Sequence, residues 1–229
     1  MPDTPEASIE SGPSERRVAW YRRRRMVFAV VLTVVVGAGS GLWWWASRDP
    51  LKLPASACWS LLDQNDLRSL AGAAQGTYTV RHGEHDGDEI ALLPGIRSQT
   101  CTVAQDYRVL SGVTVRLWDK LTYHDVYEAN ADPAARRQSD LGPDIQGLWE
   151  EDSRMRLAFL CDNPAAELTH LTYLEVVVWG DSELVDPKLP SVRQARLDAA
   201  LKVAKAAATT NACVNPVHFP ARAKEPGVV

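Results

Sequence analysis

An uncharged, strongly apolar run over residues 26–46 constrains this chain more than any other feature of its sequence. As a helix with a rise of about 1.5 Å per residue, the run would be roughly 31 Å long, which matches the hydrocarbon core of a bilayer. Basic residues favour the cytoplasmic end of such a helix, and tryptophan rings favour the headgroup region. Both signals flank this run, as Arg22, Arg23, Arg24 and Arg25 before it and Trp43, Trp44 and Trp45 at its far end. The sequence therefore predicts one transmembrane helix over 26–46, with a disordered cytoplasmic tail over 1–25 and a juxtamembrane linker over 47–53.

Other interpretations of the run fit its flanks less well. A cleavable signal peptide needs a short apolar region and a small-x-small cleavage site, whereas this run is long and ends in tryptophans. A buried core helix would not normally carry an arginine cluster at one end and three tryptophans at the other. Arg16 and Arg17 resemble a twin-arginine signal, but the arginine run directly against the apolar segment favours an anchor.

Small residues within the run raise the question of a dimer. Gly37 and Gly41 are four residues apart, and the residues between them are also small. This spacing lets two membrane helices approach closely, so a dimer through Gly37 and Gly41 is one hypothesis. The simpler explanation is that glycine and serine are common in membrane helices.

Charge divides unevenly on the two sides of the run. Residues 1–25 hold six arginines and four acidic residues, which leaves 19 basic and 25 acidic residues in the rest of the chain. The formal net charge of -4 thus combines a basic tail with an acidic body. An acidic body without a basic aromatic patch excludes a nucleic-acid binder, and anionic lipid accounts for the arginine cluster. The lipid bilayer is accordingly the first expected partner.

All four cysteines, Cys58, Cys101, Cys161 and Cys213, follow the apolar run. This placement is typical of a body that folds in an oxidising compartment, where disulfides persist. Their spacing matches no zinc site and contains no CxxC motif. Three pairings exist, and we prefer the sequential one, Cys58 with Cys101 and Cys161 with Cys213, because it keeps each bridge within one half of the body. Lipidation of Cys58 is not expected, because charged residues separate it from the apolar run and its loss would leave an odd number of cysteines.

Hydrophobic patterning after the anchor predicts an α+β domain over 54–215, with an antiparallel sheet, flanking helices and disulfide staples, followed by a flexible tail over 216–229. Asp63 is expected to cap a helix that ends at Gly72, and Ser191 with Gln194 forms a capping-box pattern ahead of an alanine-rich helix that runs to about Asn211. Alternating or β-branched stretches predict strands at 77–81, 100–104, 109–117, 155–161 and 174–179. Residues 119–152 are expected to be loop-like, with a short helix near 123–129.

A short motif resembles a known family. Cys58-Trp59-Ser60-Leu61-Leu62 is followed by Asp66-Leu67, by Leu70-Ala71-Gly72 and then by Cys101 on a predicted strand. Over residues 54–119 the chain resembles actinobacterial cell-envelope domains of unknown function, which occur on lipoproteins and membrane-anchored proteins. The resemblance implies an extracytoplasmic α+β domain and a bridge from Cys58 to Cys101. It implies no catalytic residue.

The densest polar cluster lies at residues 82–89 and contains two histidines and four acidic residues. Its imidazoles and carboxylates are metal-ligand types, which makes His82, His85 and Asp86 the candidate ligands. No helix or strand is expected to rigidify the stretch, so we predict a solvated acidic loop, no bound metal and no cofactor.

Other polar groups match no catalytic pattern. His124 and Asp125 lack a nucleophile elbow, and adjacent residues on a strand would point to opposite faces. The acids Glu150, Glu151 and Asp152 are expected to form a solvated turn. Trp149 beside them is a candidate for stacking on a sugar, although Trp59, Trp118, Trp149 and Trp179 are better explained as partly buried core aromatics.

Two hypotheses for function remain. The first is a single-pass, membrane-anchored extracytoplasmic protein that acts as a non-enzymatic binding or interaction module at the cell envelope, with an envelope protein or polymer as partner. The alternative is an envelope hydrolase whose site is assembled from dispersed carboxylates and histidines, with His82, His85 or His124 as participants. The absence of any recognised catalytic motif favours the first.

Overall fold

The structure is a computed structural model that describes residues 50–83, 85–86, 91–95, 97–129, 136–150, 154–162 and 171–224. The side chains of 85–86, 128–129, 136–140 and 171 lie outside that description. The expected tail, the expected membrane helix and residues 47–49 of the linker also lie outside the described residues. They include Arg22 to Arg25, Gly37, Gly41 and Trp43 to Trp45. Among the helices that are described, none has the length and apolar character needed to cross a bilayer.

The domain is built on an antiparallel sheet whose strands run in the order β4-β3-β5-β6-β10-β9-β8-β7. In that order they are β4 (His85–Asp86), β3 (Thr79–His82), β5 (Ser98–Gln105), β6 (Arg108–Asp119), β10 (Leu171–Trp179), β9 (Arg154–Leu160), β8 (Ile145–Glu150) and β7 (Arg136–Asp140). A small second sheet pairs β1 (Ser56–Ala57) with β2 (Leu62–Asp63). The antiparallel sheet of the predicted α+β fold is confirmed.

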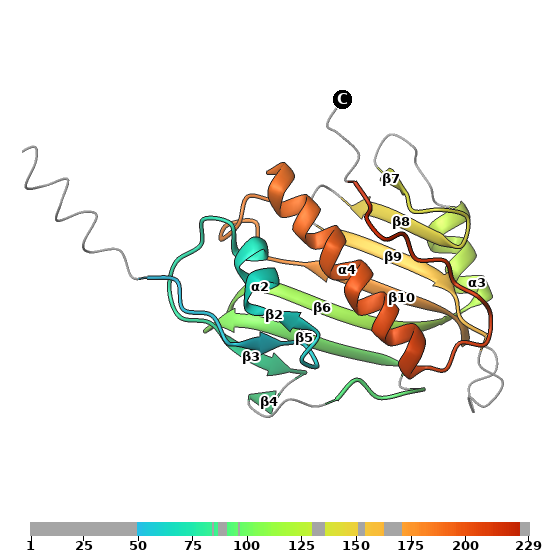
Figure 1. The fold of residues 1–229 in the computed structure, drawn as a ribbon, viewed down its shortest axis with the longest axis horizontal. Coiled ribbons are helices and arrows are strands. Elements are labelled where there is room, and N and C mark those ends of the chain that lie inside the picture. Colours follow the sequence, from blue (N-terminus) through green and yellow to red (C-terminus); the bar gives the residue numbers. More distant parts are fainter. Residues whose placement is uncertain are drawn as a thin grey trace, which may run out of the picture. The chain divides into compact units, whose positions relative to one another are not determined.

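Helices cover the two faces of the large sheet unequally. The long α4 (Pro190–Thr210) crosses one face, with α2 (Gln64–Ala71) beside it (Figure 1). We call this the helix face. The short α3 (Lys120–Tyr123) continues into a π-helix, η1 (His124–Ala129), and packs on the opposite side, which we call the open face.

Alternation along the central strands separates two clusters of buried residues. On the helix face, Val113, Val115 and Leu117 of β6 join the main core with Leu174 and Val176 of β10. The intervening positions point to the open face, where Tyr123, Tyr127, Leu148 and Ala158 form a smaller cluster. The open face also carries polar and charged side chains, which is why the candidate site is found there.

Both disulfides follow the preferred sequential pairing. Cys58 is bonded to Cys101, and Cys161 to Cys213. The first bridge anchors a tight turn in which Cys58, Trp59 and Ser60 all have positive φ, at 52°, 64° and 58°. Left-handed backbone costs a non-glycine residue roughly 1–2 kcal/mol, so the bridge and the buried Trp59 ring hold the chain in an unfavourable conformation.

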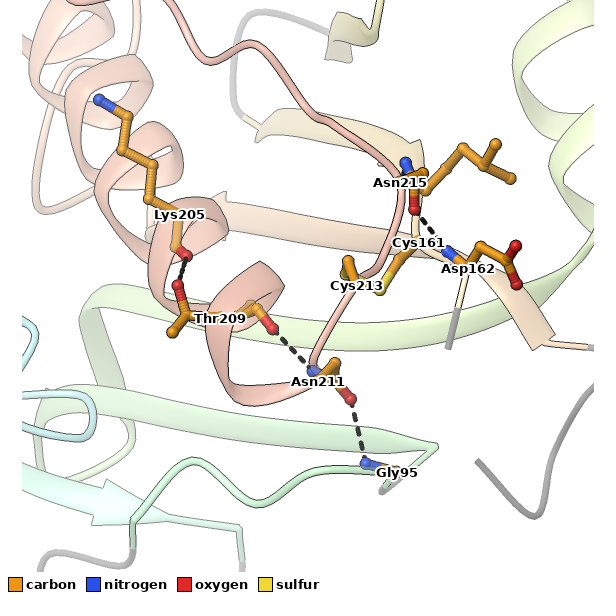
Figure 2. Close-up of a disulfide and its surroundings, with 10 residues drawn as sticks. Gly95, Cys161, Asp162, Lys205, Thr209, Asn211, Cys213 and Asn215 are labelled. Atoms are coloured by element: carbon orange, nitrogen blue, oxygen red, sulfur yellow. Dashed lines mark hydrogen bonds between the residues drawn. A yellow bond between two sulfur atoms is a disulfide. The ribbon is translucent and has the colours of Figure 1, made fainter. Parts of the chain in front are cut away.

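The second bridge fixes the segment that follows α4 (Figure 2). Asn215 Oδ1 accepts a hydrogen bond from the Asp162 amide at 2.7 Å, and Asn215 Nδ2 donates to the Leu160 carbonyl at 2.9 Å. Asn211 Oδ1 accepts from the Gly95 amide at 3.0 Å, which joins the end of the helix to the loop before β5. Of the residues assigned to a tail from 216 onward, Phe219 packs edge-on against Phe159, and Ala223 is buried.

Residues 119–152 differ from the predicted loop, although η1 confirms the short helix predicted near 123–129. They contain α3, η1, β7 and β8, and Glu150 is the last residue of β8 rather than part of a solvated turn. Ile145, Gly147 and Trp149 of β8 point to the helix face. Because Gly147 has no apolar side chain, the sequence of β8 does not show the regular alternation that predicts a strand. Trp149 is 1% exposed, so it is a core residue and offers no surface for a sugar.

The start of α4 also corrects a prediction. The N-cap is Leu189, without a side-chain cap, and Pro190 is the first helical residue. Pro is favoured there because its fixed φ suits the helix and its missing N–H would be unpaired anyway. Gln194 instead donates to Asp198 Oδ1 and to the Ala223 carbonyl. The Ser191–Gln194 capping box is therefore wrong.

Two arginines of α4 are buried, which an alanine-rich helix does not suggest. The Arg193 guanidinium carbon lies 4.9 Å from the centroid of the Trp149 ring, a cation–π arrangement. Burial lowers the pKa of Arg196 to about 10, so this side chain still carries its charge at neutral pH. Both arginines thus place charged groups among the buried residues of the helix face.

The predicted cap at the start of α2 is confirmed. Asp63 Oδ1 accepts from the amides of Asn65 at 2.8 Å and Asp66 at 3.1 Å, and the Asp66 carboxylate accepts from the Asp63 amide, which completes a capping box. Lys202 of α4 donates to both carboxylates and so joins the two helices. Hydrogen bonds from the Asp66 and Asn65 amides, and then from Lys202, hold the pKa of Asp63 below its usual value of 3.8.

We expect Asp63→Asn to lower the free energy of unfolding at neutral pH, because it removes the hydrogen-bonded carboxylate of Asp63. A carboxyl with a depressed folded-state pKa contributes stability that is present above its unfolded value and is lost as the pH falls through the folded value. The variant should therefore unfold at lower denaturant than wild type at pH 7, and the difference should shrink below pH 3.8. Guanidinium unfolding of the purified chain from pH 7 to pH 2.5 measures this. Glu183→Gln, at a highly exposed carboxylate, is the control; a difference that stays constant with pH would contradict the role of Asp63.

Candidate functional site

A pocket of about 640 Å³ opens where β5 begins and β6 ends. Its lining residues come from the start of β5, the end of β6 and α3, and they are Arg97, Ser98, Arg116, Leu117, Trp118, Asp119 and Thr122. The volume falls within the range of about 300–1,000 Å³ that is typical of ligand pockets. We call this the β6 pocket.

Charge in the β6 pocket is mainly basic. Arg97 is exposed and, within the described residues, its guanidinium has no ion-pair partner. Arg116 is opposite Glu175 in the β6–β10 register, and its Nη1 lies 4.0 Å from Glu175 Oε2. The pocket's acidic residue among those described, Asp119, uses Oδ1 to accept from the Thr122 amide at 2.7 Å. The lining thus presents two guanidinium groups with free donor positions.

A buried ionic network lies next to the pocket. Glu175 is 1% exposed, and its Oε1 accepts from the Tyr127 hydroxyl at 2.7 Å and from Arg156 Nε at 2.8 Å. Arg156 Nη1 donates to Glu150 Oε1 at 2.6 Å. Glu175 Oε2 accepts no hydrogen bond from the described residues. The network therefore fixes a carboxylate whose second oxygen lies 4.0 Å from Arg116 Nη1.

The network sets the protonation states of its members. Burial, reinforced by the charge of Glu175, raises the pKa of Tyr127 well above 10, so its hydroxyl stays protonated and donates. Burial disfavours the charged form of Arg156, but the charges of Glu175, Tyr127 and Glu150 outweigh it and raise the pKa of that guanidinium. The result is one buried carboxylate held by a neutral phenol and a permanent cation.

Three tyrosines and a tryptophan pack around these charges. The Tyr123 ring stacks on Tyr173, with centroids 3.8 Å apart, and on Tyr127 at 5.0 Å. The Arg156 guanidinium carbon is 5.6 Å from the centroid of Trp118, which lines the pocket. The π-helical turn of η1 carries Tyr127 to Glu175, and such turns are frequent at functional sites.

A second pocket of about 710 Å³ lies between α4 and the segment after it. It is lined by Lys202, Lys205, Arg222 and Lys224 among other residues. Lys202 is already paired with Asp63 and Asp66, and Lys205 donates to the Pro220 carbonyl at 3.5 Å. Lys202 thus joins α4 to α2, and Lys205 attaches the C-terminal segment to α4. Because these two basic groups are already engaged within the chain, we place the candidate site at the β6 pocket.

The structure disperses the histidines that the sequence singled out. His82 is 6% exposed at the end of β3, on the helix face beside the Trp59 ring, so its expected place in a solvated loop is wrong. His124 begins η1, and neither pocket is lined by a histidine among the described residues. His124 and Asp125 share a helical turn, in agreement with the short helix predicted near 123–129.

The backbone of the three metal candidates lies in one hairpin. His82 and His85 are opposite each other in the β3–β4 hairpin, and Asp86 is paired with Arg81. The side chains of His85 and Asp86, like residues 87–90, lie outside the description. No group of three or more metal-ligand residues is found among the described residues.

One histidine–carboxylate pair was not foreseen. His218 Nδ1 lies 2.6 Å from Asp144 Oδ2, and the same oxygen accepts from the His218 amide at 3.0 Å. Hydrogen bonds from the His218 side chain and amide lower the pKa of Asp144. The His218 side chain is 77% exposed, so the pair serves to attach the C-terminal segment beside β8.

Comparison with protein-family models, with curated proteins and with solved structures finds no match to this chain. A functional argument must therefore rest on the site itself. The β6 pocket combines cationic donors, one hydroxyl side chain from each of Ser98 and Thr122, and an aromatic wall. That combination is suited to holding a polar ligand in a fixed orientation.

Proposed function

We propose that the chain is a single-pass, membrane-anchored extracytoplasmic protein whose folded domain is a binding module at the cell envelope. The observation that carries the proposal is the combination of an apolar run flanked by arginines and tryptophans with a following domain closed by two disulfides. Disulfides persist in oxidising compartments, and the anchor pattern orients the domain toward such a compartment.

Binding is favoured over hydrolysis by the arrangement of the open face. The buried Glu175 is held by Tyr127 and Arg156, so it is a positioning group and not a free base. His82 packs in the helix-face core, and His124 lies in η1. A site for acid–base chemistry needs a base within reach of a nucleophile, whereas the β6 pocket presents donors and an aromatic wall.

Crosslinking on intact cells that produce the tagged full chain tests this function. The control chain keeps residues 1–53 and carries an unrelated folded domain in place of the rest. We expect an envelope protein or polymer fragment to be recovered with the full chain and lost with the control, because recognition resides in the domain. Identical products from both chains would show that the anchor alone accounts for them and would contradict the proposal.

A further inference from the structure

We propose that the β6 pocket binds an oxyanion, a carboxylate or phosphate group of its ligand, through Arg97 and Arg116. This inference rests on the proposed binding function and specifies the ligand chemistry of that site. It is drawn from the lining residues, their ionic partners and the network beneath them.

The first support is the availability of guanidinium donors. Arg97 lines the pocket without an ionic partner among the described residues, and Arg116 is 4.0 Å from Glu175 Oε2, which exceeds hydrogen-bond length. A guanidinium presents five N–H donors in a planar fork that matches the two oxygens of a carboxylate or phosphate. Both arginines therefore retain donor positions for a ligand.

The second support is the buried carboxylate of Glu175. Its Oε1 is satisfied by Tyr127 and Arg156, and its buried Oε2 accepts no hydrogen bond from the described residues. The remaining charge attracts Arg116, which is its cross-strand neighbour. Glu175 thus acts as a positioning residue that holds the Arg116 guanidinium at the pocket. The N–H donors of Arg116 remain available to a ligand.

The third support is that the pocket lining is basic, whereas the chain beyond residue 25 is acidic. Beyond residue 25 the chain has 25 acidic and 19 basic residues, yet the pocket lining has two arginines and one aspartate, which already caps α3. A local excess of positive charge in a concave site concentrates anions there. Trp118 adds a flat apolar wall, which suits a ring or sugar next to the oxyanion.

Isothermal titration calorimetry of the full chain in neutral detergent micelles tests the inference. The probes are inorganic tripolyphosphate and citrate, titrated separately at constant ionic strength so that general screening is matched. We expect saturable binding of at least one probe, and the tighter probe identifies phosphate or carboxylate as the source. Arg97→Gln and Arg116→Gln should each weaken it by at least about tenfold, as expected for loss of a charge-assisted hydrogen bond.

Arg108→Gln is the matched control, because Arg108 lies on the same strand at the opposite end and pairs with Glu183 at the surface. It should leave probe affinity within about twofold of wild type. Arg97 is exposed, so its variant keeps the test valid even if Arg116→Gln disturbs folding. Absence of saturable binding of both probes, or binding unchanged in Arg97→Gln, would overturn the inference. A partner captured on cells equally well by wild type and Arg97→Gln would preserve the binding function while removing the anion site.

Discussion

Replacing Glu175 by leucine is expected to destabilise the domain by about 3–5 kcal/mol, the range seen when one partner of a buried ion pair is removed. The substitution leaves the Arg156 side chain, which is 12% exposed, without the more deeply buried of its two carboxylate partners. It also leaves the buried Tyr127 hydroxyl without its acceptor. Guanidinium unfolding of the purified chain at pH 7 measures the loss.

Apolar replacement of Glu175, Arg156 and Tyr127 together separates the effect of their charges from that of their packing, while Glu150, whose side chain is 27% exposed, stays in place. Glu175→Leu combined with Arg156→Met and Tyr127→Phe removes all three polar groups together, and such replacements are often neutral or stabilising. We expect the triple variant to recover most of the stability that the single variant loses. A single variant within about 1 kcal/mol of wild type would contradict the role of Glu175 as the buried partner of Arg156 and Tyr127.

Removal of the bridge between Cys161 and Cys213 is the second change that we expect to lower stability strongly. The bridge closes a loop over a sequence separation of 52 residues, for which chain entropy predicts a loss of about 4 kcal/mol. Cys161→Ala with Cys213→Ala should lower the free energy of unfolding by that order. It should also raise amide hydrogen exchange around Asn215, because the bridge and the Asn215 hydrogen bonds together join this segment to β9.

The other bridge provides the comparison. Cys58→Ala with Cys101→Ala opens a loop of similar separation, 43 residues, and should cost a similar free energy. Its exchange changes should appear at the left-handed turn of Cys58 to Ser60 instead. If both double variants raise exchange in the same segment, the assignment of each bridge to its own region would be wrong.

Local patterns in the sequence predicted a large part of the fold. Asp63 and Asp66 are three residues apart, and their capping box consists of hydrogen bonds between neighbours in the sequence. The alternation of Val113, Val115 and Leu117 identified β6 and its core-facing side. It did not indicate that Thr114 on the other side is buried as well. The cysteine spacing left three pairings open, and the preferred one is the one observed.

The candidate site depended on strand register, which local patterns do not provide. Arg116 and Glu175 both lie within or near predicted strands, but only the β6–β10 pairing places them opposite each other. A single acid inside the apolar stretch of β10 was the available signal, because a buried charge requires a partner. Arg97 carried no such signal, since an exposed arginine before a strand is ordinary.

Labelling of lysines on intact cells with a membrane-impermeant amine reagent tests the central proposal most directly. All six lysines follow residue 51, and they are exposed in the structure. An anchored extracytoplasmic domain should carry the label at residues such as Lys52, Lys120 and Lys188 before lysis, as read by peptide mass spectrometry. A lysine-rich cytoplasmic protein should stay unlabelled as the control. Labelling of this chain that appears only after the cells are lysed would contradict the account.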